Sequence, residues 1–482
     1  MMAFVLLIPI LGALSIALLR RRPDYRDAAS IITAICLFGV VLSLIPQLGA
    51  NPSQTLVLLE LVPGLRLAFS LEPLGMLFAL VASGLWVVTS IYAIGYMRAH
   101  HEEHQTRFYI CFALTLAAAM GIAFADNLLT LFVFYEVMTL ATYPLVTHHG
   151  TERAVTAGRL YLGYLFATSI GLLLFAIIWT WTLTGSLDFR SGGMLAGKAE
   201  NSTLLILLAL YVFGIGKAAL MPFHRWLPAA MVAPAPVSAL LHAVAVVKAG
   251  VFCVMKVILY VFGIDLLHDT GLSVWLMYVA GATIMIASLI ALAQDDLKAR
   301  LAYSTVSQLS YIILGAALAN AAGVLGGSMH ILMHAFGKIT LFFCAGAIAV
   351  ASHKTKVSEM AHIGKHMPIT MIAFLIGSLS IIGLPPLGGS WSKWYLILGA
   401  INAAQMPLVA VLLVSSLLNI AYLMPVVGRA FFAGGAEVVN TDEIHEAPWP
   451  CVVPLCVTAA GCLLLFFFAG EVYEFLAPLV QR

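Results

Sequence analysis

The sequence predicts an all-α polytopic membrane protein. Of its 482 residues, 62% are hydrophobic and only 10% are charged. A soluble protein of this size carries more charge to cover its surface. Apolar stretches long enough to cross a hydrocarbon core of about 30 Å recur along the whole chain, and they leave almost nothing for a soluble domain.

These stretches predict about fourteen transmembrane helices, one for each long run of hydrophobic residues. The first run starts at residue 2 and has neither a basic leader nor a small-residue cleavage site, so we interpret it as a membrane helix and not as a signal peptide. In chain order the predicted helices span residues 2–19, 28–48, 75–97, 107–125, 127–147, 155–183, 203–227, 235–260, 273–293, 300–319, 322–351, 368–400, 405–432 and 450–473.

The loops predict an orientation. With an even number of helices both termini lie on one side of the membrane, and alternate loops then divide the basic residues between the two sides. One side receives most of them, while the other receives only Arg66, Arg190, Lys198 and Arg482. The positive-inside rule makes the rich side cytoplasmic, so both termini are predicted to face outward. The net charge of +2 gives no reason to expect a nucleic-acid partner.

Two predicted helices look interrupted. Residues 214–228 of the seventh helix and residues 383–389 of the twelfth combine glycine with proline. Proline removes a helix donor and glycine loosens the backbone, and non-helical backbone at membrane depth is tolerated where it is buried in protein or lines a water-filled cavity. The breaks fall at comparable places in helices four to eight and nine to thirteen. Because five is odd, two such groups in tandem run in opposite senses, which is typical of an inverted-repeat transporter.

The predicted organisation therefore has four parts. No linker or low-complexity stretch separates them. They are the N-terminal helices one to three (1–98), a first inverted repeat of helices four to eight (107–260), a second inverted repeat of helices nine to thirteen (273–432), and the C-terminal helix fourteen (450–482).

Six charged residues lie where the chain is predicted to be inside the bilayer. An ionisable group at that depth costs about 2.5 kcal/mol or more, so each one is a functional-site candidate. Several lysines of this kind in one chain predict a route for protons or cations. The six residues are Glu136, Lys217, Lys248, Lys256, Lys338 and Lys393.

Glu136 lies near the middle of the fifth predicted helix and is the only carboxylate that we place at bilayer depth. A lone buried carboxylate is normally protonated, while an adjacent lysine holds it ionised. Lys217 is the natural partner, since helices five and seven belong to one bundle. Making and breaking this pair would gate a proton. The alternative is a static ion pair that holds the two helices together.

Lys248 lies in the middle of the eighth predicted helix. A desolvated lysine can lose its charge and relay protons, although it can also remain bonded to backbone carbonyls without titrating. Lys256 lies two turns further on, close to the predicted outer end, and we predict that its side chain extends to the membrane interface. His242, six residues before Lys248, is a further relay candidate.

The eleventh predicted helix carries His330, His334 and Lys338 at intervals of four residues. They form one stripe, with steps of about 40° around the helix, which indicates a hydrated path or a row of partners. Imidazole can relay protons near neutral pH. No third ligand accompanies the two histidines and the cysteines form no metal set, so we predict no metal, no disulfide and no cofactor. Lys393 follows the break in the twelfth helix and is either an exit residue or an anchor.

Motifs along essentially the whole chain carry a resemblance to a known family. They are Phe-Tyr-Glu136, Lys217 before Met-Pro-Phe-His-Arg-Trp-Leu-Pro228, Ala-Pro-Ala-Pro236-Val-Ser-Ala-Leu-Leu-His242, Lys248, Ala-Tyr-Ser-Thr305-Val-Ser-Gln308, His330 to Lys338, and Gly-Leu-Pro-Pro386 before Ser392-Lys393. With these motifs the chain resembles the antiporter-like membrane subunits shared by Mrp-type sodium/proton antiporters, respiratory complex I and membrane-bound hydrogenases.

The resemblance implies two inverted five-helix repeats, each of which forms a half-channel for protons. It implies that Glu136 and Lys217 serve the first half-channel and that Lys248 connects the two. His334 and Lys338 would then form the central axis, and Lys393 would serve the second half-channel. It also implies other membrane subunits as partners, and a bacterial cytoplasmic (inner) membrane as the location.

Within the family the chain looks most like the D-type component of an Mrp-type sodium/proton antiporter. It lacks the long lateral helix of the distal complex I subunit and the extra domain of the large Mrp subunit, and it has Lys393 where the middle complex I subunit usually has a carboxylate. No carboxylate cluster suits sodium, so a sodium site is expected in a partner. The alternatives are the pump subunit of a redox-driven complex and the membrane subunit of an inorganic-carbon uptake complex. No redox or hydrolytic site is expected in this chain itself.

Overall fold

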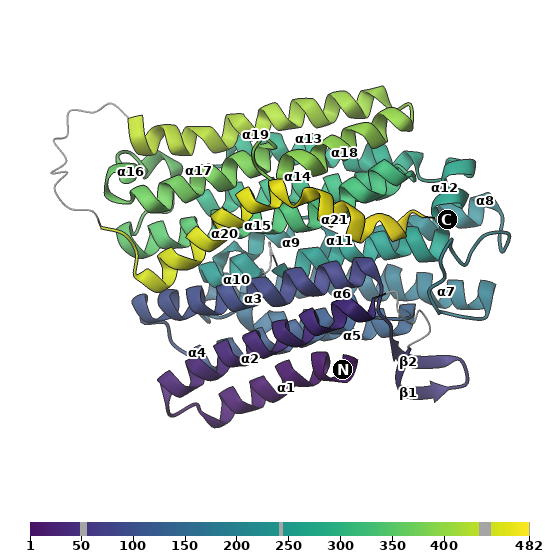
Figure 1. Cartoon of the computed structure of the whole chain (residues 1–482), viewed down its shortest axis with the longest axis horizontal. Coiled ribbons are helices and arrows are strands. Elements are labelled where there is room, and N and C mark those ends of the chain that lie inside the picture. The colour runs from purple at the N-terminus through teal and green to yellow at the C-terminus, as the bar shows by residue number, and fades with distance from the viewer. Residues whose placement is uncertain (49–54, 241–243, 433–444, 482) are drawn as a thin grey trace.

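Long helices run side by side in the computed structural model, which describes residues 1–48, 55–240, 244–432 and 445–481 (Figure 1). Both termini lie toward the same end of the helices, together with a small β-hairpin. We call this end the termini face. The opposite end holds the loop between the first two helices and the short helix α16.

The N-terminal part contains α1 (Met2–Leu18), α2 (Pro23–Leu44) and α3 (Pro73–Ala99). Proline opens both α2 and α3, at the first helical position, where its missing N–H leaves no hydrogen bond unmade. All three helices agree with predicted stretches.

A two-stranded hairpin departs from the all-α prediction. Strands β1 (Leu56–Val62) and β2 (Leu65–Phe69) pair in antiparallel fashion, in the segment that connects α2 to α3. Pro63 and Gly64 join the strands, and Gly64 has φ of 87°, a backbone conformation that favours glycine. The hairpin places Arg66 and the segment before α3 on the termini face.

The middle of the chain contains α4 to α12. In it, α6 continues through a π-helical turn into α7, and α11 continues through a second π-helical turn at Val257–Phe262. The helices are α4 (Gln105–Ala123), α5 (Leu128–Val146), α6 (Glu152–Thr168), α7 (Leu174–Thr184), α8 (Asn201–Gly214), α9 (Trp226–Ala229), α10 (Ala235–Ala239), α11 (Val246–Lys256) and α12 (Ile264–Thr270).

The last part contains α13 to α21. The long helix α15 is buried along nearly its whole length and packs against α14, α17, α18 and α20. The helices are α13 (Val274–Ala293), α14 (Leu297–Ala317), α15 (Ala321–Ser352), α16 (Ile363–His366), α17 (Pro368–Ile382), α18 (Gly389–Asn402), α19 (Met406–Phe432), α20 (Trp449–Phe467) and α21 (Ala469–Leu476).

The chain is a multi-pass membrane protein. Within the described residues, nine helices are long and apolar enough to cross a bilayer, or up to ten if the bent pair formed by α11 and α12 counts as one span. Three shorter apolar helices, α1, α8 and α17, add to these. The fold is predominantly helical, as predicted, while the exact number of fourteen spans stays a prediction.

Both predicted interruptions are present. Helix α8 ends at Gly214 and is followed by a short 3-10 turn, and α17 ends at Ile382 before α18 starts at Gly389. A third departure from regular helix lies at Ala245, directly before α11, where we predicted one continuous helix over 235–260. No residue type marks this break in advance, because neither glycine nor proline occurs between Val237 and Ala249.

Gly250 lets α11 approach the broken seventh helix. A methyl group at Gly250 would collide with the backbone of Lys217 and Ala218. This contact holds the turn after α8 against α11, and so it fixes the position of Lys217.

We predict that Gly250→Ala lowers the free energy of unfolding by about 1–3 kcal/mol, because overpacking forces the backbone apart. Gly163→Ala is the matched control, since Gly163 lies inside α6 with no atom near its added methyl group. Thermal unfolding of the purified protein in detergent measures both variants. Equal melting temperatures for the two variants would contradict the predicted close packing.

Candidate functional site

Lys217 lies in the turn that interrupts the seventh predicted helix, and its side chain is fully buried. Its Nζ donates to the carbonyl oxygen of Tyr135 at 2.8 Å and to Oγ1 of Thr139 at 2.6 Å, both on α5. The amine also lies 3.2 Å from the centroid of the Tyr135 ring. The break itself is stabilised by Trp226, whose Nε1 donates to the carbonyl of Gly216 at 3.0 Å.

Glu136 follows Tyr135 on the same turn of α5, so the structure brings it close to Lys217. Both of its carboxylate oxygens are buried, and neither has a hydrogen-bond partner among the described residues. Within the same residues Glu136 and Lys217 form no ion pair. A buried carboxylate without a partner is costly, so Glu136 needs a proton, a cation or water to stabilise it. The gating pair therefore stays a prediction.

Lys248 and His334 are in direct contact. Lys248 lies in the first turn of α11 and His334 near the middle of α15, and both side chains are buried. A hydrogen bond joins Nζ of Lys248 to Nδ1 of His334. An ammonium and an imidazolium both only donate, so at least one of the two groups is uncharged when this bond exists. The contact therefore joins α11 to α15.

His330 and Lys338 occupy the same stripe of α15, as the sequence predicts. His330 bonds through Nδ1 to Oγ of Ser392 at 2.9 Å and through Nε2 to Oε1 of Gln308 at 3.1 Å. The Gln308 oxygen can only accept, so Nε2 carries a proton. Nζ of Lys338 donates to Oγ of Ser304 at 2.6 Å and lies 3.3 Å from the carbonyl oxygen of Leu301.

Lys393 lies in the first two turns of α18 and is 7% exposed. Its Nζ donates to the carbonyl oxygen of Ile382 at 3.0 Å and to Oγ of Ser416 at 3.1 Å. Ile382 is the last residue of α17, so its carbonyl has no acceptor role within that helix. The second break therefore supplies a ligand for a buried lysine.

A chain of hydrogen bonds links Lys338 to Lys393 through α14 and α19. Oγ of Ser304 lies 2.7 Å from the hydroxyl of Tyr422, which lies 2.5 Å from the Asn419 amide. With the amide oriented so that its nitrogen faces Tyr422, the Asn419 oxygen accepts from Lys393 at 3.1 Å and from Nε2 of Gln308 at 3.3 Å.

The sequence analysis missed Asn419 and Tyr422. Both lie on the otherwise apolar helix α19 and are buried, together with Ser415. Their spacing of four and three residues places these polar groups on one face of α19. The same argument that singled out the stripe on α15 would have found them.

Lys256, which we predicted to extend to the membrane interface, is instead enclosed by protein. Its side chain is 1% exposed. Nζ lies 2.7 Å from Oε1 of Glu72 and donates to the carbonyl oxygen of Ala125 at 2.6 Å. Glu72 directly precedes α3, in the segment between the predicted helices 28–48 and 75–97, so a second, partly buried carboxylate contacts one of the six candidate residues.

His242 lies outside the described residues. Among the described residues no group of three histidine, cysteine, aspartate or glutamate side chains could hold a metal ion, and the seven cysteines are free thiols. The structure therefore brings together Lys217 with the α5 turn of Glu136, Lys248 with His334, and Lys338 with Lys393.

The chain matches known proteins over most of its length. Residues 125–419 match the family described as "NADH:quinone oxidoreductase/Mrp antiporter, TM", and residues 64–109 match the one described as "NADH-Ubiquinone oxidoreductase (complex I), chain 5 N-terminus". The chain is 36% identical over 416 residues to the NADH-quinone oxidoreductase subunit N of Desulforudis audaxviator, over 83% of this chain and 82% of that protein.

Two longer relatives extend the comparison. Hydrogenase-4 component B of Escherichia coli is 31% identical over 86% of this chain and 64% of its own length. The chloroplast NAD(P)H-quinone oxidoreductase subunit 5 of Chaetosphaeridium globosum is 33% identical over 68% of this chain and 50% of its own length. The chain thus spans between half and two thirds of these two relatives.

Solved structures show the same fold. One chain of an archaeal membrane-bound sulfane sulfur reductase superimposes with a TM-score of 0.88 at 23% identity, and one chain of the Mrp complex from a Dietzia species with a TM-score of 0.86 at 21% identity. Each comparison covers 99% of this chain and 97% of the other.

We predict that Asn419→Ala lowers the free energy of unfolding by about 1–3 kcal/mol, since it removes an acceptor from the buried Gln308 amide and from Lys393. The matched control is Asn402→Ala, because Asn402 is exposed at the end of α18. Thermal unfolding in detergent compares the two variants. A loss no greater for Asn419→Ala than for Asn402→Ala would show that the chain of bonds around Asn419 does not form.

Proposed function

Because the chain belongs to the NADH:quinone oxidoreductase/Mrp antiporter transmembrane family, we propose that it moves protons across a membrane as one subunit of a larger membrane complex. The single observation that carries this proposal is the row of buried basic side chains that runs through the interior. Charged groups at this depth are retained where they mark an ion or proton pathway.

Each group of residues along the proposed pathway, which we call a station, has a distinct environment. Glu136 and Lys217 serve the first half of the chain, and the Lys248–His334 contact connects α11 to α15. Lys338 and Lys393 serve the second half. Because charges interact strongly in a medium of low dielectric constant, a proton that arrives at one station changes the proton affinity of the next.

The two helix breaks support the inverted-repeat organisation with repeats at 107–260 and 273–432. Lys217 lies in the first break and Lys393 just after the second. Each amine donates to one main-chain carbonyl and one hydroxyl group. Matching lysine sites at matching breaks are expected if the two repeats form two half-channels.

We further propose a bacterial cytoplasmic (inner) membrane as the location, with both termini outside. The position of both termini at one end of the bundle supports this orientation (Figure 1). The loop between α1 and α2 lies at the opposite end and contains Arg20, Arg21 and Arg22, which the positive-inside rule assigns to the cytoplasm.

The partners decide what drives the pathway. We propose an Mrp-type sodium/proton antiporter with this chain as its D-type component. The second candidate is a redox-driven complex, which the two curated relatives from NADH-quinone oxidoreductase and hydrogenase-4 favour. The third is an inorganic-carbon uptake complex.

Purification of the intact complex separates these candidates. Small membrane subunits alone support the antiporter, iron–sulfur proteins support the redox-driven complex, and a zinc hydratase-like protein supports carbon uptake. A chain that purifies without any partner would contradict the proposed complex.

We predict that Lys217→Ala and Glu136→Ala each abolish proton transport while the complex still assembles, since each removes a group that takes up and releases the proton. Proton flux is measured in membrane vesicles with a pH-sensitive dye. Lys198→Ala is the control, because Lys198 is exposed in the loop before α8 and should leave the flux unchanged. Normal flux in either test variant would rule out the proposed pathway.

A further inference from the structure

A largely buried ion pair lies near the termini face, apart from the lysine sites described above. Lys256, at the end of α11, pairs with Glu72, which directly precedes α3. Lys256 is 1% exposed and the Glu72 side chain is 15% exposed. The two residues therefore form a carboxylate–amine pair between the protein interior and the solvent.

Charged side chains lead from this pair toward the surface. The amine of Lys256 donates to the carbonyl of Ala125, and the next residue, Asp126, lies 3.5 Å from Arg66. Arg66 also lies 3.3 Å from Asp188. Exposure of the side chains rises along this series, from 17% for Asp126 to 34% for Arg66 and 37% for Asp188.

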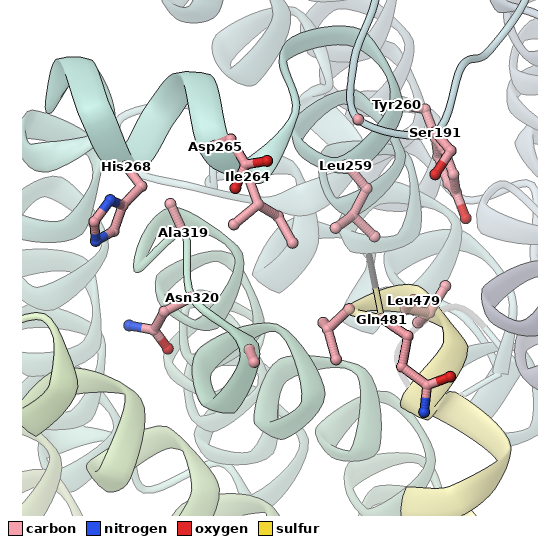
Figure 2. Close-up of a pocket in the computed structure, with 13 residues that line it drawn as sticks. Ser191, Leu259, Tyr260, Ile264, Asp265, His268, Ala319, Asn320, Leu479 and Gln481 are labelled. Atoms are coloured by element: carbon pink, nitrogen blue, oxygen red, sulfur yellow. The ribbon is translucent and has the colours of Figure 1, made fainter.

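A cavity of about 310 Å³ opens on the same side (Figure 2). Figure 2 shows that its walls come from separate parts of the chain, among them Leu259, Tyr260, Asn320 and Leu479. Tyr260 connects the cavity to the ion pair, since the centroid of its ring lies 5.7 Å from Nζ of Lys256 and its side chain lies beside Glu72. Polar groups and this volume make the cavity suitable for water.

The helix that carries Lys256 also carries Lys248. Lys256 lies eight residues after Lys248, which corresponds to a rise of about 12 Å along α11. Lys248 in turn contacts His334, so α11 carries both the ion pair and a contact of the interior pathway.

Both charge states of the pair have partners. The ammonium form of Lys256 is stabilised by Glu72, by the Ala125 carbonyl and by the faces of Phe189, Phe252 and Tyr260, at 4.3 to 5.7 Å from their centroids. After proton transfer, a neutral amine and a neutral carboxyl group can still form a hydrogen bond with each other.

We propose that Glu72 and Lys256 form a proton-exchange site that connects the interior pathway to the cavity on the termini face. In the outward direction an N–H bond of the Lys256 ammonium breaks and an O–H bond forms on Glu72, which leaves both groups neutral. Glu72 then gives the proton to water in the cavity and regains its negative charge, and Lys256 takes the next proton from the interior. Inward movement reverses these steps. This inference rests on the proposed proton transport.

Lys256→Arg tests the proposal against a purely structural ion pair. Arginine keeps the positive charge and can pair with Glu72, but it does not release its proton in a protein. We expect the complex to assemble and the proton flux to fall about tenfold or more, because a required proton carrier is lost. A flux equal to that of the unmodified complex would overturn the proposal and leave a static pair.

Three further variants complete the test. Lys198→Arg is the matched surface control and should not change the flux. Lys217→Arg should lose transport, and normal flux in that variant would reject the proposed function itself and not only this site. The double variant Glu72→Gln with Lys256→Gln keeps a hydrogen bond without a titrating group, so it covers the case in which Lys256→Arg fails to assemble. It should also lose transport, and normal flux would overturn the proposal.

The pH dependence gives a readout that a structural role would not change. In vesicles whose two sides are held at different pH, Glu72→Gln should shift the dependence of flux on the pH at the termini face. The dependence on the pH at the opposite face should stay as it is. An equal effect on both faces, or none on either, would overturn the assignment of Glu72 to the termini face.

Discussion

An amine buried among apolar helices needs oxygen atoms to replace water, and this requirement organises the interior of the protein. In a bilayer no solvent is available to satisfy it. Three buried lysines each donate hydrogen bonds to one main-chain carbonyl and one hydroxyl group. They are Lys217 with Tyr135 and Thr139, Lys338 with Leu301 and Ser304, and Lys393 with Ile382 and Ser416. A hydroxyl group can accept from an ammonium and donate to a neutral amine, so these sites accommodate both states of the lysine.

The helix breaks follow from the same requirement. The end of α17 presents a carbonyl to Lys393, and the turn after α8 brings Lys217 onto α5. Proline and glycine allow these breaks, while contacts such as Gly250 against the backbone of Lys217 keep them in place. Lys256 differs from the three lysines in having a carboxylate as its partner, which fits a position nearer to solvent.

Much of the fold could be predicted from the sequence, because length and hydrophobicity mark membrane helices directly. The breaks at 214–228 and 383–389 were visible as glycine and proline, and the buried lysines as charges in apolar runs. The break before α11 and the partner of Lys256 were not visible. The first has no breaker residue, and the second depends on Glu72, which lies far away in the sequence. The linkage through Asn419 depends in the same way on contacts between distant helices.

The Asn419 amide has a consequence for what can pass between Lys338 and Lys393. A hydroxyl or an imidazole can accept a proton on one side and give up another on the other side, but an amide nitrogen holds its two hydrogens and its oxygen only accepts. The hydrogen bonds through Ser304, Tyr422 and Asn419 can therefore transmit an electrostatic effect but not a proton. Each lysine senses the charge of the other through these bonds, while a proton that moves between Lys338 and Lys393 needs a route other than the Asn419 amide.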